Sequence, residues 1–129
     1  MTPATRALMG GARWLALAAY VALMALLAAW YGWLHPPRVV PPAAAVALAL
    51  VPLLPALPGL LRGRPYTHAW ASLLILAYLA HGIMESLAAP AQAGLARLEV
   101  VLASLFFAAA LLYARVRGRQ ERQAPERGA

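Results

Sequence analysis

Several residue types are missing from this sequence, and each absence excludes a kind of chemistry. There is no cysteine, which excludes disulfides, iron-sulfur clusters, thiol catalysis and cysteine-based zinc sites. Only 12% of the residues are charged, against about a quarter in soluble domains. No catalytic triad, phosphate-binding loop or nucleotide motif is present. We therefore expect no enzymatic activity, no catalytic residue and no bound cofactor or metal.

Apolar residues dominate what remains. They make up 64% of the 129 residues, the mean hydropathy is +0.69, and several apolar runs approach 20 residues in length. Runs of this length match the hydrocarbon thickness of a bilayer when they form helices. Transmembrane β-strands would instead alternate polar and apolar residues in short segments, a pattern that is absent here. The composition predicts an all-α, polytopic membrane protein.

Four apolar runs predict a four-helix transmembrane domain over residues 1–114. They cover residues 14–34, 43–61, 66–89 and 98–114. The second run contains Pro52, Pro55 and Pro58, each of which removes a backbone donor, so its second half should be kinked or unwound. Such backbone must be buried against protein or line a wet cavity. Beyond these runs, residues 115–129 predict a basic, disordered tail.

The eleven arginines set the expected orientation, since the chain has no lysine. Nine lie in the N-terminal segment, the loop between the second and third runs, and the tail; the other two are Arg38 and Arg97. Cationic loops resist translocation, so a bundle with both termini in the cytoplasm is predicted. The net charge of +7 is then explained by this bias and by attraction to anionic lipid headgroups, rather than by nucleic-acid binding.

Ionisable residues inside the predicted spans are the main functional candidates. His81 and Glu85 are spaced i, i+4 in the third run, which places them on one helix face where they can touch. Glu99 begins the fourth run at the same outer level, and Arg97 and Arg38 are cations that could reach this layer. We expect a polar cluster of His81, Glu85 and Glu99 with one arginine.

Three interpretations of this cluster are open. It could lock the third and fourth helices together through hydrogen bonds. A His-Glu pair could also titrate near neutral pH and carry a proton or ion. A metal site is the third possibility, although His81 and Glu85 supply only two ligands and would need Glu99 or His35 to complete it.

A second group of candidates lies at the opposite, basic end of the third run. Basic and amphipathic side chains cluster here, as is typical of a membrane interface. The predicted face for a lipid headgroup or a protein partner consists of Arg62, Arg64, Tyr66, Thr67, His68 and Trp70. His68 lies on a different helix face from His81, so the two histidines cannot share a haem.

The stretch LPALPGLLRGRPYTHAWASLLILAYLAHGIMES, residues 54–86, carries a family resemblance. A proline-rich second span precedes a basic G-R-x-Y-T turn, a tryptophan and a Y-x-x-H-G element before an acidic residue. In these features the chain resembles the proteobacterial inner-membrane proteins of domain of unknown function 2069. The matching positions are Pro52, Pro55, Pro58, Gly63, Arg64, Tyr66, Thr67, Trp70, Tyr78, His81, Gly82 and Glu85. The resemblance implies a fold and an inner-membrane location, and brings no activity with it.

Two functional hypotheses follow. The first is a structural or accessory membrane protein that binds a lipid or a membrane-protein partner, including another copy of itself. The second is a small oligomeric transporter linked to protons or ions, with His81 and Glu85 as its polar site.

Overall fold

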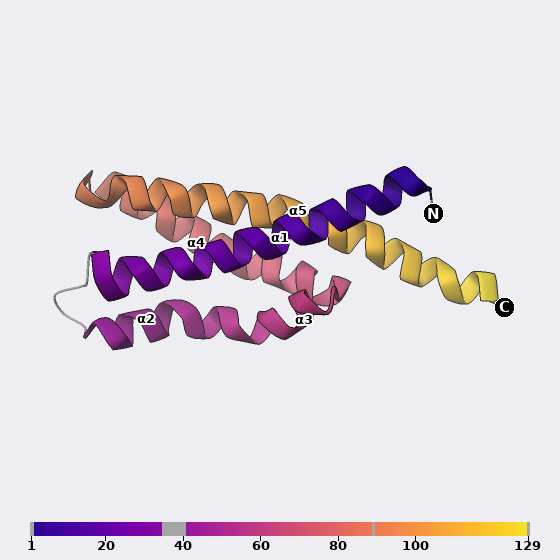
Figure 1. Ribbon diagram of the computed structural model, residues 1–129, viewed down its shortest axis with the longest axis horizontal. Helices are drawn as coiled ribbons and strands as arrows, with labels where there is room; N and C mark the ends of the chain where they lie inside the picture. Colours follow the sequence, from indigo (N-terminus) through magenta and orange to yellow (C-terminus); the bar gives the residue numbers. More distant parts are fainter. Residues whose placement is uncertain (1, 35–40, 89, 129) are drawn as a thin grey trace.

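The computed structural model describes residues 2–34, 41–88 and 90–128, which form a bundle of long helices (Figure 1). In chain order the elements are α1 (Pro3–Ala29), the π-helix η1 (Trp30–Leu34), α2 (Pro42–Leu50), the 3-10 helix η2 (Val51–Ala56), α3 (Leu57–Leu61), α4 (Pro65–Ala88), the 3-10 helix η3 (Pro90–Gln92) and α5 (Ala93–Gly128). Within this part of the chain, four helical segments are long and apolar enough to cross a membrane. The expected number of spans is confirmed.

The helices run back and forth, so that both ends of the chain lie on the same side of the bundle (Figure 1). The turn between α3 and α4 lies toward that side too, whereas α1 and α4 end at the other. Four spans require this arrangement, which agrees with the even number that the sequence predicts. The side of the membrane on which the termini lie stays a prediction.

Helix α5 forms the most extensive contacts of the bundle, with α4 on one side and α1 on the other. The core between them is built largely of alanine, leucine and aromatic residues; the rings of Tyr20 and Phe106 lie 4.9 Å apart at its centre. Small residues allow helices to approach closely where lipid supplies no hydrophobic driving force. Large apolar side chains such as Leu73 and Leu87 point outward, as expected of a surface in contact with acyl chains.

The proline-rich span is interrupted as predicted. Residues Val51–Ala56 form a 3-10 segment between α2 and α3, with Pro55 inside it. Two tyrosine hydroxyls donate to carbonyls at this break: Tyr20 to Leu53 at 2.5 Å, and Tyr78 to Ala49 at 2.6 Å. Because lipid cannot satisfy a free carbonyl, these bonds explain how the irregular backbone is tolerated.

We expect Tyr20→Phe to lower the free energy of unfolding by about 1–3 kcal/mol, since the buried Leu53 carbonyl loses its donor. Unfolding by sodium dodecyl sulfate in mixed micelles measures this change. Tyr66→Phe is the matched control, because Tyr66 is 79% exposed. Equal stability of the two variants would show that the Tyr20 hydroxyl contributes nothing.

The C-terminal segment differs from the expected disordered tail. Helix α5 continues beyond the predicted end of the fourth span at residue 114 and runs to Gly128. The residues past the span are mostly arginine, glutamine, glutamate and alanine, all of which favour helix, so the backbone can extend the transmembrane helix into the polar region. Helix α1 likewise begins at Pro3, well before the predicted start at residue 14.

Candidate functional site

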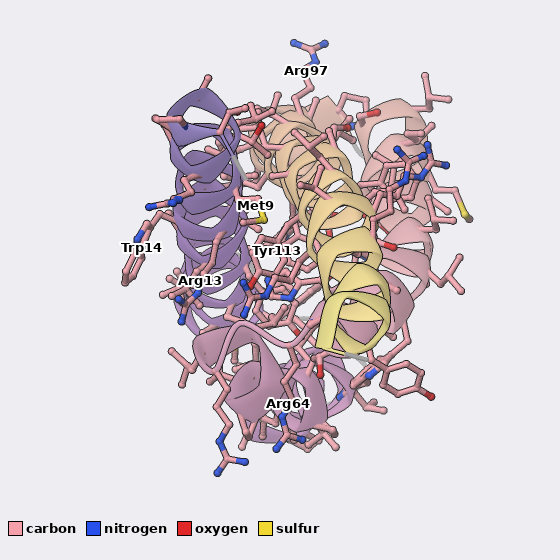
Figure 2. The ribbon with its side chains drawn as sticks, turned by 90° about the vertical axis from the view of Figure 1, so that its right-hand side faces the viewer. Met9, Arg13, Trp14, Arg64, Arg97 and Tyr113 are labelled. Atoms are coloured by element: carbon pink, nitrogen blue, oxygen red, sulfur yellow. The ribbon has the colours of Figure 1, made fainter. Side chains whose placement is uncertain are left out.

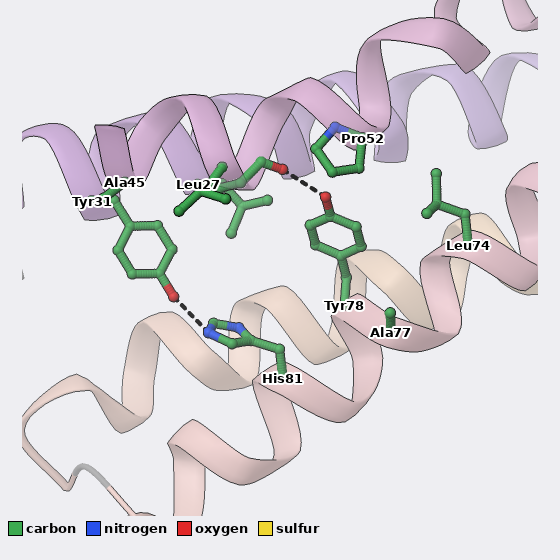
Figure 3. Close-up of a pocket in the computed structure, with 10 residues that line it drawn as sticks. Leu27, Tyr31, Ala45, Pro52, Leu74, Ala77, Tyr78 and His81 are labelled. Atoms are coloured by element: carbon green, nitrogen blue, oxygen red, sulfur yellow. Dashed lines mark hydrogen bonds between the residues drawn. The ribbon is translucent and has the colours of Figure 1, made fainter. Parts of the chain in front are cut away.

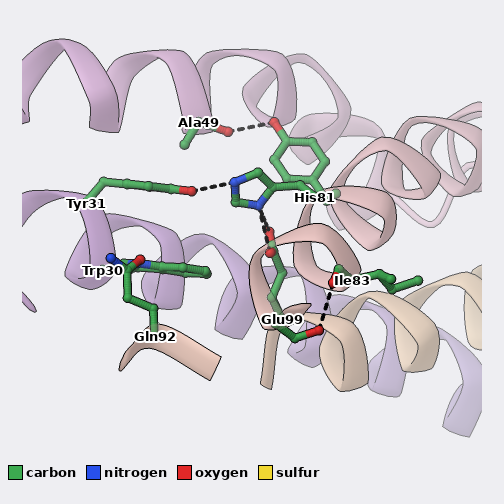
Figure 4. Close-up of polar contacts among 9 residues, drawn as sticks. Trp30, Tyr31, Ala49, His81, Ile83, Gln92 and Glu99 are labelled. Atoms are coloured by element: carbon green, nitrogen blue, oxygen red, sulfur yellow. Dashed lines mark hydrogen bonds and ion pairs between the residues drawn. The ribbon is translucent and has the colours of Figure 1, made fainter. Parts of the chain in front are cut away.

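The centre of the candidate site is a contact between α4 and α5. His81 Nδ1 lies 2.9 and 3.2 Å from the two carboxyl oxygens of Glu99 (Figure 4). Glu99 is fully buried, whereas the His81 side chain is 37% exposed. Gly82 makes the approach possible, because a Cβ there would lie 3.0 Å from Glu99 Oε1 and 3.1 Å from the Ala96 carbonyl. The pairing of His81 with Glu99 agrees with the sequence prediction.

A third member comes from the end of the first span. The Tyr31 hydroxyl lies 2.6 Å from His81 Nε2, so both ring nitrogens of the histidine are engaged. Trp30 stacks on Tyr31 with ring centroids 5.1 Å apart, and its Nε1 donates to Gln92 Oε1 at 2.7 Å (Figure 4). The π-helix η1 turns both aromatic residues toward the neighbouring helices; π-helical turns are often found at functional sites. We call Tyr31, His81 and Glu99 the triad.

The other two members of the predicted cluster do not join the triad. Glu85 is partly buried, and it forms no hydrogen bond with His81. The expected contact is therefore wrong: the nitrogens of His81 are occupied by Tyr31 and Glu99. Arg97 is exposed and points away from the bundle (Figure 2). It lies two residues before Glu99, about 200° around a helix, so burial of Glu99 turns Arg97 outward.

Two further candidates for the cluster were His35, as a metal ligand, and Arg38, as a cation. His35 and Arg38 lie outside the described residues. Among the residues that the structure describes, no three metal-ligating side chains come together.

A pocket of about 480 Å³ lies beside the triad, between α1, α2, η2 and α4 (Figure 3). Its lining residues are Leu27, Tyr31, Ala45, Leu48, Ala49, Pro52, Leu74, Ala77, Tyr78 and His81. Leu48 is 72% exposed, which places the mouth of the pocket on the lipid-facing surface. The volume is typical of sites for small molecules, and the pocket has an apolar wall with polar groups from Tyr31, Tyr78 and His81.

The predicted interfacial face is divided by the fold. Arg62, Arg64 and Tyr66 are exposed, as an interfacial face requires. Thr67 and His68 are buried instead, and Trp70 is partly buried against the core. Thr67 is buried because α3 folds back on α4 and places Gly59 directly against it.

His68 is therefore not the interfacial anchor that the sequence suggested. Its ring lies 4.4 Å from the Tyr113 ring, and its Nδ1 donates to the Arg64 carbonyl at 2.7 Å. The burial of His68 thus comes from its contact with α5, whereas its neighbour Thr67 is covered by α3, where Gly59 packs directly on it.

Sequence reasoning missed the tyrosines of the site. Neither Tyr31 nor Gln92 is among the candidates that the sequence offers, and Tyr78 enters only through the family resemblance. Tyr31 follows an apolar run and carries no motif, so only the helix order reveals that it reaches His81. One signal was available: proline-rich backbone needs donors, and tyrosines within neighbouring spans are suitable donors.

The four apolar helices, the lipid-facing exterior and the buried triad define a small multi-pass α-helical membrane protein. The chain belongs to the family of predicted membrane proteins described as domain of unknown function 2069, which matches residues 15–118. The resemblance seen in the sequence is thereby confirmed over most of the chain. No curated protein and no solved structure matches it.

Proposed function

We propose that this protein is an accessory membrane protein that binds a lipid-like molecule in the pocket beside the triad. The observation that carries the proposal is the pocket itself: about 480 Å³, an apolar wall, a mouth at the exposed Leu48, and polar groups of Tyr31 and His81 in its lining. A molecule dissolved in the bilayer can enter sideways without crossing water. Its chain would lie on Leu27 and Leu74, and its polar group would lie near Tyr31 and His81.

The proposal also includes the orientation of the bundle and the membrane in which it lies. The end of the bundle that holds both termini also holds Arg13, Arg62 and Arg64, so this end should face the cytoplasm. Exposed Arg62, Arg64 and Tyr66 would then contact anionic headgroups of a bacterial inner membrane. Binding of a protein partner or of a second copy of the chain stays a prediction.

Filling the pocket tests the proposal. We expect Ala77→Trp to reduce labelling of the protein by a phospholipid with a diazirine in its acyl chain by about tenfold, which a clash of about 1.4 kcal/mol suffices to cause. Mass spectrometry of nanodisc-embedded protein then locates the label on peptides of α1, α2 and α4.

The matched control is Leu73→Trp, which adds the same ring on the same helix at a residue that is 68% exposed and does not line the pocket. This variant should label like the wild type. If the two variants label equally, or if the label is spread evenly over lipid-facing residues, the pocket is not a binding site.

A proton-linked transporter is the second candidate, and the burial of Glu99 favours it. A carboxyl group that is fully buried in a span and hydrogen-bonded to a histidine is typical of proton pathways. In vesicles with a pH gradient, Glu99→Gln should abolish proton-linked flux, whereas Glu85→Gln should weaken it. Absence of flux in the wild type, or flux that Glu99→Gln leaves intact, would exclude transport through the triad.

A further inference from the structure

Tyr31 lines the pocket with a hydroxyl whose proton is either free or donated to His81, and this limits what the pocket can bind. We infer that the pocket selects an uncharged, long-chain molecule with a carbonyl oxygen at its polar end, and that a proton on the triad switches this selectivity. The inference rests on the proposed function, because it names the ligand of the same pocket. It follows from counting the hydrogen-bond donors and acceptors around His81.

The hydroxyl proton of the other tyrosine in the pocket lining is already in use, because Tyr78 donates it to the Ala49 carbonyl. The lining residues from α1 and α2 are apolar. Tyr31 therefore decides whether the pocket offers a donor or an acceptor.

When the triad is electrically neutral, Tyr31 offers a donor. With His81 protonated and Glu99 ionised, Nδ1 donates to the carboxylate and Nε2 donates to the Tyr31 oxygen. With the proton moved to Glu99, the carboxyl group donates to Nδ1 and Nε2 again donates to Tyr31. In both forms the Tyr31 hydroxyl proton is free to point into the pocket. A carbonyl oxygen of a ligand can accept it.

Removing one proton reverses the role of Tyr31. Neutral His81 then keeps its proton on Nδ1 for the carboxylate, so Nε2 must accept the proton of the Tyr31 hydroxyl. The pocket loses its donor. This form also leaves a net negative charge on a carboxyl group that is fully buried, which is costly in a membrane, so the neutral form is the favoured one.

The charges that face the triad argue for an uncharged ligand. Glu85 lies on α4 and acts on His81, and Glu99 lies behind it on α5. Arg97, also on α5, points away from the bundle and cannot neutralise an anion here. The negative side chains disfavour a ligand carboxylate or phosphate, and an ammonium group cannot accept the Tyr31 proton. A ketone, ester or quinone oxygen fits both conditions.

Competition between probes tests the inference. Unlabelled 2-hexadecanone and hexadecane, equal in chain length, each compete with the diazirine lipid for wild-type protein in nanodiscs. We expect the ketone to compete at a concentration about three- to tenfold lower than the alkane, as one hydrogen bond implies. Tyr31→Phe should remove this preference, so that the ketone competes no better than the alkane.

The pH dependence separates a switch from a fixed donor. Ketone competition by the wild type should weaken as the pH is raised through the loss of the triad proton. Glu99→Gln should move this pH dependence to lower pH, because His81 is then the titratable group left in the triad and has lost the carboxylate that stabilises its protonated form. If Glu99 had only a structural role, Glu99→Gln would leave the pH profile of ketone competition unchanged.

The outcomes distinguish this inference from the proposed function. If ketone and alkane compete equally, or if Tyr31→Phe keeps the ketone preference, the inference is wrong while the pocket still binds lipid. A ketone preference that does not change with pH in the wild type overturns the switch. If neither probe competes, or if labelling is insensitive to Ala77→Trp, the proposed function itself fails.

Discussion

His81→Leu is expected to lower the free energy of unfolding by about 3–5 kcal/mol, because it leaves the buried Glu99 carboxyl group without its partner. Leucine has a similar size, so the loss of packing should be small. The carboxyl group would have to stay charged in a low-dielectric interior or bind a proton and remain without a hydrogen bond, and both alternatives are costly. Unfolding by sodium dodecyl sulfate in mixed micelles gives the magnitude.

The double variant His81→Leu with Glu99→Leu is the decisive control. Replacing both members of a buried polar pair by apolar residues is often neutral, so most of the lost stability should return. The difference between the single and double variants isolates the cost of the unpaired carboxyl group. If His81→Leu alone is as stable as the wild type, the contact seen between α4 and α5 does not contribute to folding.

Glu99→Gln separates stability from function. It keeps an amide that can hydrogen-bond His81, so it should cost far less stability than His81→Leu while still moving the pH dependence of binding to lower pH. A variant that folds and changes only its pH response shows that the carboxyl group has a role besides holding two helices together.

The number of spans and the break at the prolines could be predicted from the sequence because both depend on local properties. Span length follows from the thickness of the bilayer, and a proline removes a donor wherever it stands in a helix. The level of His81 and Glu99 in the membrane also follows from counting residues along two adjacent helices. Their contact, confirmed at 2.9 Å, needed only a tight connection between those helices.

Contacts that depend on the order and rotation of the helices could not be predicted. Tyr31 reaches His81 because the first span packs across from α4, and nothing in a loop length specifies that neighbour. The position of Arg97 was predictable in principle from the position of Glu99, two residues later on the same helix. His68 was misjudged because it packs on Tyr113 of α5, a tertiary contact, while its neighbour Thr67 packs under α3 at Gly59, which has no side chain.

That contact gives the second large effect: Gly59→Ala should lower the free energy of unfolding toward the upper end of about 1–3 kcal/mol, the range for overpacked cores. A Cβ at this position would overlap Thr67 Oγ1 and would lie 2.6 Å from Thr67 Cβ. Rotation of the Thr67 side chain relieves the first clash but not the second, because Cβ is fixed to the backbone. Helix α3 would have to move away from α4.

The turn between the two helices leaves little room for such a movement. Arg64 N donates to the Gly59 carbonyl at 3.0 Å, and Gly63 has a φ of 71° that favours glycine. The Tyr113 hydroxyl also holds the Gly63 carbonyl at 2.5 Å, so displacing α3 would strain the contact with α5 as well. The methyl group that Gly59→Ala adds would therefore disturb the packing of α3 against both α4 and α5.

Gly94→Ala is the matched control for this substitution, since a Cβ at residue 94 meets nothing within 4 Å. It should be neutral or stabilising by about 0.5–1 kcal/mol, the usual gain from replacing a helical glycine. The pair Gly59→Ala with Thr67→Gly removes the clashing atoms and should recover part of the stability, less the cost of a glycine in α4. If Gly59→Ala is no less stable than Gly94→Ala, α3 does not pack on Thr67, and the burial of Thr67 beneath this turn must be reconsidered.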